Sequence, residues 1–103
     1  MKNTVKVSVV QLACEWLQLE QNIQRMRDHV ESEAKSGQEL IVFPELSNIG
    51  YITPLLPGEP VGYGDMDFTN FVSTYIRTAE TIPGPTTEAI SELTRRYGVY
   101  VII

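Results

Sequence analysis

Apolar residues along this chain form three short runs separated by stretches with helical spacing. Residues 40–43 are apolar without polar alternation, which predicts a strand buried on both faces of a parallel sheet. Residues 5–12 and 99–103 are rich in β-branched side chains and predict two further strands. A helix is predicted between the first two strands from apolar positions three or four residues apart: Leu19, Ile23, Met26, Val30 and Ala34. This order predicts a parallel βαβ unit with a right-handed crossover.

Two more helices are predicted before the last strand, over residues 68–79 and 85–97. Asp65 or Asp67 could cap the first of them. Pro85 suits the first turn of the helix over residues 85–97. Gly37 suits the position just after the helix that begins near Leu19, and Gly98 the position just after residues 85–97. Prolines and glycines in residues 52–64 exclude regular structure and predict a loop. The predicted fold class is therefore α/β.

The length of 103 residues allows one small core and is too short for two domains. A domain normally finishes on a solvated segment, whereas residues 99–103 are five apolar β-formers at the end of the chain. We therefore expect residues 1–103 to be an incomplete domain with its first three strands and about three helices.

Charge and cysteine content narrow the class of partner and compartment. The formal net charge of -5 repels phosphate backbones and anionic lipid, so we expect neither nucleic acid nor a membrane as partner. No apolar stretch approaches the length that spans a bilayer. The single cysteine, Cys14, excludes an internal disulfide and fits a reducing cytoplasm.

Glu45 is the leading candidate for chemistry. Pro44 has no N–H for the ladder and ends the strand at residues 40–43, so Glu45 stands just beyond its carboxyl end. Open α/β folds bind their ligands there. Nearby apolar surface would desolvate this carboxylate or demand a partner for it, and either outcome suits a general base. A solvated loop carboxylate or a helix N-terminal acid is the alternative.

Several motifs together resemble the opening of the nitrilase superfamily of carbon-nitrogen hydrolases, over the whole chain. They are the strand followed by Phe43-Pro44-Glu45-Leu46, then Gly50-Tyr51, with Gln11 closing the first strand and Asn22-Ile23 in the helix between. The resemblance implies an α-β-β-α sandwich and a Glu-Lys-Cys triad that cleaves a nitrile, amide or N-carbamoyl compound. Glu45 corresponds to the triad's Glu. In family order the Lys and Cys follow Ile103, so we expect the isolated chain to be inactive.

Other candidate residues carry weaker signals. The resemblance implies that Tyr51 helps to line the substrate pocket, although a packed aromatic is an equal alternative. Cys14 suits a small buried hydrophobe better than a nucleophile, and His29 lacks a second group to orient it. Asp65 and Asp67 lack a third ligand, and the glycines of residues 58–64 match no nucleotide-binding fingerprint. We therefore expect no metal and no cofactor.

Two main classes of function remain open, beside a weaker third: a small flavodoxin-like α/β module that binds a ligand at the strand ends, against which the lack of a phosphate loop counts. The first is the N-terminal part of a hydrolase that acts on a small molecule. We expect this hydrolase to form homo-oligomers. The second is an inactive binding or interaction module, in which the unfilled edge after residues 99–103 pairs with another copy or with a complementary chain.

Overall fold

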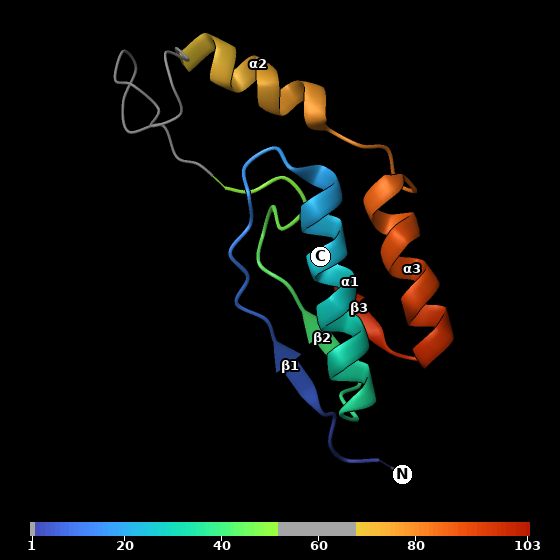
Figure 1. Ribbon diagram of the computed structural model, residues 1–103. Coiled ribbons are helices and arrows are strands. Elements are labelled where there is room, and N and C mark those ends of the chain that lie inside the picture. The colour runs from blue at the N-terminus through green and yellow to red at the C-terminus, as the bar shows by residue number, and fades with distance from the viewer. Residues whose placement is uncertain (1, 52–67) are drawn as a thin grey trace.

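The computed structural model describes residues 2–51 and 68–103 and shows a small sheet with helices packed on one side of it (Figure 1). The elements follow in the order β1 (Val7–Val9), α1 (Leu19–Lys35), β2 (Leu40–Val42), α2 (Phe68–Thr78), α3 (Pro85–Tyr97) and β3 (Tyr100–Ile102). The predicted α/β class is confirmed. Each strand is shorter than predicted, because regular pairing is confined to three positions in each.

All strand pairs in this sheet are parallel, in the order β1-β2-β3. Leu40 of β2 lies between Val7 of β1 and Tyr100 of β3, and the two following residues of each strand pair in the same register. Helix α1 connects β1 to β2 as the predicted βαβ unit requires. The central strand is β2, so the residue that follows it emerges between two neighbouring strands.

One face of the sheet is covered by α1 and α3, and the core lies between them (Figure 1). Met26 and Val30 of α1 and Ile41 of β2 are fully buried at its centre. The remaining buried members of the core are Val10, Phe43, Ile90, Leu93 and Val99. Arg27 of α1 donates a hydrogen bond from Nη1 to the Ala89 carbonyl at 2.5 Å, which ties the two helices together.

The opposite face of the sheet is apolar and open in this chain. Exposed fractions reach 75% at Val9, 78% at Tyr100 and 54% at Ile102. Leu40 and Val42 point to the same side and are half-buried, so the prediction of burial on both faces is wrong for these two residues. Their neighbours Ile41 and Phe43 face the helices. A sheet with helices on one face and bare apolar side chains on the other corresponds to one half of an α-β-β-α sandwich.

The helix ends agree with the sequence prediction. After α1, the N–H of Gly37 donates to the Ala34 carbonyl at 3.0 Å. At the end of α3, the N–H of Gly98 donates to the Thr94 carbonyl at 2.9 Å. Pro85 occupies the first turn of α3.

Helix α2 lies across one end of the structure rather than on the sheet (Figure 1). Phe71 is buried and stacks on Trp16 with ring centroids 5.9 Å apart, and Tyr75 donates to the Gly50 carbonyl at 2.7 Å. Val72 and Ile76 are exposed, at 37% and 69%, so α2 buries only part of its apolar side chains. None of the helices in the described part of the chain is long and apolar enough to cross a membrane. Residues 52–67, including the loop and the caps predicted at Asp65 or Asp67, lie outside the described residues.

Candidate active site

Glu45 follows the central strand at the carboxyl edge of the sheet. The N–H of Phe43 still bonds to the Ile102 carbonyl of β3 at 2.9 Å, and the Phe43 side chain is buried in the core. Pro44 then has no N–H to continue the ladder, so the chain leaves the sheet at this residue. The predicted position of Glu45, just beyond β2, is where the structure places it.

The turn that carries Glu45, residues 44–50, is closed by its own hydrogen bonds. The N–H groups of Ile49 and Gly50 donate to the Leu46 carbonyl at 3.2 and 2.8 Å. The Ser47 hydroxyl is buried and donates to the Pro44 carbonyl at 2.5 Å. These bonds satisfy groups that the sheet no longer pairs, so the turn has a defined shape.

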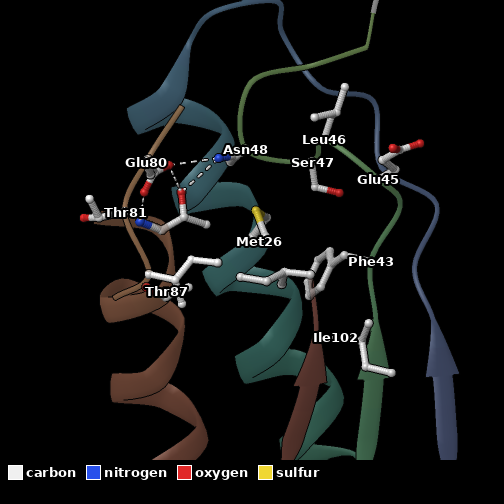
Figure 2. A pocket seen from close by; sticks show the side chains of 13 residues that line it. Met26, Phe43, Glu45, Leu46, Ser47, Asn48, Glu80, Thr81, Thr87 and Ile102 are labelled. Atoms are coloured by element: carbon white, nitrogen blue, oxygen red, sulfur yellow. Dashed lines mark hydrogen bonds between the residues drawn. The ribbon is translucent and has the colours of Figure 1, made fainter. Parts of the chain in front are cut away.

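Glu45 lies on the rim of a cleft of about 520 Å³. Figure 2 shows the carboxylate of Glu45 pointing away from Glu80 and Asn48, with Met26 and Phe43 between the two sides. The floor is apolar, and the far wall is polar because it is made by the start of α3 and the residues before it. The lining residues are Met26, Phe43, Glu45, Leu46, Ser47, Asn48, Glu80, Thr81, Ile82, Thr86, Thr87, Ile102 and Ile103.

The polar wall is organised around Glu80. Its Oε1 accepts a hydrogen bond from the N–H of Thr86 at 2.6 Å, and its Oε2 accepts from the Thr86 hydroxyl and from Asn48 Nδ2, the latter at 2.9 Å (Figure 2). Burial of Glu80 favours its neutral form, but these hydrogen bonds outweigh burial and hold the pKa of the carboxyl below its ordinary value. Glu80 is therefore an ionised acceptor that satisfies the free N–H of Thr86 at the start of α3.

A second polar group, Asn22, joins the turn to the loop after β1. Its side chain is fully buried in α1. Nδ2 donates to the carbonyls of Glu15 and Asn48 at 2.6 and 3.0 Å, while Oδ1 accepts from the N–H of Glu15 at 2.8 Å. The N–H of Leu17 also bonds to the Ile49 carbonyl at 2.7 Å. The two loops at this edge of the sheet are therefore held together as one unit.

The surroundings of Glu45 differ in one respect from the sequence prediction. The side chain is exposed rather than desolvated, and within residues 2–51 and 68–103 no group forms a hydrogen bond or ion pair with it. Tyr51 is 65% exposed and does not line the described cleft. The catalytic role of Glu45 and the substrate-binding role of Tyr51 stay predictions.

Cys14 and His29 occupy positions that suit packing. Burial raises the pKa of the Cys14 thiol, against smaller opposing effects of the Ser47 hydrogen bond and of Arg25, so the thiolate is disfavoured. Its S–H points to the Leu12 carbonyl at 3.7 Å. His29 is half-buried with its ring edge against Phe43, at a centroid distance of 6.5 Å. Neither residue lines the cleft beside Glu45.

Gly50 allows the two loops to approach closely, and its replacement is expected to be costly. Its φ is +81°, and a Cβ would lie 3.0 Å from the Trp16 Cα. We expect Gly50→Ala to lower the free energy of unfolding by about 2 to 4 kcal/mol, from left-handed strain together with the clash. Gly37→Ala is the control, because its φ is +90° with nothing within 4 Å, and should cost about 1 to 2 kcal/mol. Urea unfolding would measure both; equal losses would show that the contact with Trp16 is unimportant.

The sequence analysis predicted no role for three residues of this site, Asn22, Asn48 and Glu80, although it named Asn22 as part of the family resemblance. Asn22 had a detectable signal, because it precedes Met26 and Val30 by steps of four and therefore shares their buried helix face. A carboxylate shortly before a helix that starts with Pro85 could also have suggested a cap at Glu80. Nothing in the sequence indicated that Asn48 would join them.

Comparison with known proteins identifies a family that covers nearly the whole chain. Residues 6–103 match the family model described as carbon-nitrogen hydrolase. A protein named nitrilase from Meyerozyma guilliermondii is 31% identical over 99 residues, which are 96% of this chain and 29% of that protein. Nitrilase 2 and nitrilase 1 of Arabidopsis thaliana are each 26% identical, over 96% and 97% of this chain and 29% of their own lengths. The chain thus spans less than a third of these curated relatives.

Proposed function

Because this chain belongs to the carbon-nitrogen hydrolase family, we propose that it is the N-terminal part of an enzyme that cleaves a non-peptide carbon-nitrogen bond, with Glu45 as the general base. The substrate would be a small nitrile, primary amide or N-carbamoyl compound. One observation carries the assignment of the base. Glu45 emerges beyond the central strand, on a turn of defined shape, at the edge of the sheet where α/β folds bind ligands.

In the proposed mechanism, Glu45 accepts the proton of a cysteine thiol, and the thiolate attacks the carbon of the substrate. A lysine ammonium stabilises the negative charge that develops in the intermediate. For an amide, the proton passes to the departing amine, and water then hydrolyses the thioester while Glu45 accepts its proton. The lysine and the cysteine would come from the part of the protein beyond residues 1–103.

The exposure of Glu45 is compatible with a site to which residues 1–103 contribute the base and the rest of the protein contributes the lysine and the cysteine. A general base must lie within about 2.6 to 3.2 Å of the proton that it takes. An accessible carboxylate on the rim can receive partners from other strands of a larger sandwich. Cys14 is a poor substitute for the nucleophile, since burial raises the pKa of its thiol and it does not line the cleft.

The open face of the sheet supports the proposed incomplete domain and its association. Val9, Tyr100 and Ile102 expose more than half of their surface on that face. A second sheet of the same protein would cover it in an α-β-β-α sandwich. The full-length enzyme is proposed to be a homo-oligomer in the cytoplasm, where its single cysteine in this region stays reduced.

The alternative is an inactive interaction module, and the same face favours it. An apolar sheet face of this kind can be covered by a second copy or by a complementary chain. The two functions differ in whether a lysine and a cysteine join Glu45.

Assays of residues 1–103 and of the full-length protein separate the two functions. We expect residues 1–103 alone to hydrolyse no nitrile, primary amide or N-carbamoyl compound and to sediment as associated species, because the bare sheet face remains uncovered. The full-length protein should hydrolyse at least one of these classes. Turnover by residues 1–103 that survives Cys14→Ala would contradict the mechanism, and turnover abolished by that substitution would make Cys14 the nucleophile.

A further inference from the structure

The Glu80 carboxylate receives hydrogen bonds from two different elements. Two donors, the N–H and the hydroxyl of Thr86, belong to the first turn of α3, and the third, Asn48 Nδ2, belongs to the turn of residues 44–50. Bonds to an ionised carboxylate are stronger than those between neutral groups. Glu80 therefore anchors the turn to a helix that is itself packed into the core through Ile90 and Leu93.

Asn48 is held from two sides. Its Nδ2 donates to Glu80 at 2.9 Å and to the Thr86 Oγ1 at 3.1 Å. Its carbonyl accepts from the buried Nδ2 of Asn22 in α1 at 3.0 Å. A displacement of Asn48 would break contacts to both helices that cover the sheet.

Asn48 and Glu45 are joined by a short stretch of backbone whose conformation is fixed by hydrogen bonds. Ser47 is buried and bonds back to the Pro44 carbonyl, and the Leu46 carbonyl accepts from two N–H groups. Leu46 also has a left-handed φ of +57°, which leaves it few other conformations. Movement at Asn48 would therefore reorient the start of the turn, where Glu45 lies.

We propose that Glu80 is a positioning residue for the hydrolase reaction, which fixes the direction of Glu45 through its hydrogen bond to Asn48. This inference rests on the proposed function of Glu45. Placement matters because a base displaced by about 1 Å from its proton can lose two orders of magnitude in rate. Glu80 itself does not touch the reacting atoms.

A purely structural role would use a different part of the same network. Capping of α3 needs the bonds between Glu80 and Thr86, whereas positioning needs the bond between Glu80 and Asn48. A control that weakens the attachment of α3 without touching this network separates the two. Arg27→Gln removes the bonds from Arg27 to the Ala89 carbonyl and to Glu92, and leaves all bonds of Glu80 and Asn48 in place.

The test exchanges the donor and the acceptor of the critical bond in the full-length hydrolase. Glu80→Gln places an amide donor opposite the Asn48 amide donor, and Asn48→Asp places two carboxylates together. The double variant restores a hydrogen bond in the opposite direction, from Gln to Asp, with the Thr86 hydroxyl able to donate to the new carboxylate. Measurements are kcat, KM and the thermal midpoint, with kinetics recorded well below the midpoint.

We expect each single variant to lower kcat by about 10-fold to 100-fold, with a smaller change in KM, because the base acts in the chemical step. The double variant should recover most of that loss, as coupled residues do. Arg27→Gln should lower the thermal midpoint and keep the parent kcat, because Arg27 does not line the cleft and makes no bond to Glu80 or Asn48. A structural cap alone would lower the midpoint in all the single variants without lowering the kcat of the folded enzyme.

The proposal is overturned if folded Glu80→Gln and Asn48→Asp enzymes keep the parent kcat. It is also overturned if the double variant folds and is no faster than the single variants. Where one single variant fails to fold, the double variant is compared with the other. Glu45→Gln is measured beside them. Loss of turnover there, with the parent kcat in the other variants, defeats this inference alone; normal turnover in Glu45→Gln defeats the proposed function.

Discussion

Replacing Glu45 by glutamine in the full-length protein is expected to reduce turnover by roughly 100-fold to 10,000-fold, the usual contribution of a general base. Glutamine keeps the size of the side chain but cannot take the proton from the attacking thiol. Folding should be unaffected, since Glu45 is exposed and the turn is closed by bonds that do not involve its side chain. The thermal midpoint should therefore stay close to that of the parent.

Glu45→Asp gives a second comparison at the same position. It keeps the carboxylate and shortens its reach by one methylene, so a base that must lie within about 3 Å of its proton should again be strongly impaired. If Glu45 were only a solvated surface acid, both substitutions would change stability by less than about 0.5 kcal/mol and leave turnover unaltered. A Glu45→Gln enzyme with parental turnover would refute the catalytic assignment.

Asn22→Leu is expected to have the largest effect on stability, lowering the free energy of unfolding by about 3 to 5 kcal/mol. The leucine fits the buried position in volume but leaves the N–H of Glu15 and the carbonyl of Asn48 without a partner, while the Glu15 carbonyl keeps only its longer bond from the Gln18 N–H at 3.2 Å. Each buried polar group left unpaired costs about 1 to 3 kcal/mol, reduced where water reaches it. Urea unfolding followed by circular dichroism measures the change.

Gln21→Leu is the matched control for Asn22→Leu. It makes a similar amide-to-leucine change one residue earlier in α1, where the side chain is exposed. Its effect should lie within about 0.5 kcal/mol. If both substitutions changed stability equally, the hydrogen bonds of Asn22 would not be what holds the two loops together.

Local patterns in the sequence were sufficient for the elements of the fold. The apolar run before Pro44, the helical spacing around Met26 and the glycines after α1 and α3 predicted three strands, three helices and a parallel βαβ unit. The position of Glu45 beyond a strand was predicted in the same way, because Pro44 terminates pairing wherever the strand lies. Such signals depend on neighbours in the chain, so they can be read without the tertiary structure.

The tertiary structure decided which of these residues meet and which face of each element is covered. Leu40 and Ile41 are both apolar, yet Ile41 is buried under α1 and α3 while Leu40 faces the open side. Asn22, Asn48 and Glu80 lie far apart in the sequence and meet because parallel strands bring their loops to one edge of the sheet. Contacts of this kind depend on packing between distant segments of the chain. No local pattern in a single sequence indicates which distant segments will pack together. The sequence by itself therefore determined the elements and the place of Glu45 after β2, and only the packing decided which residues contact the turn of residues 44–50.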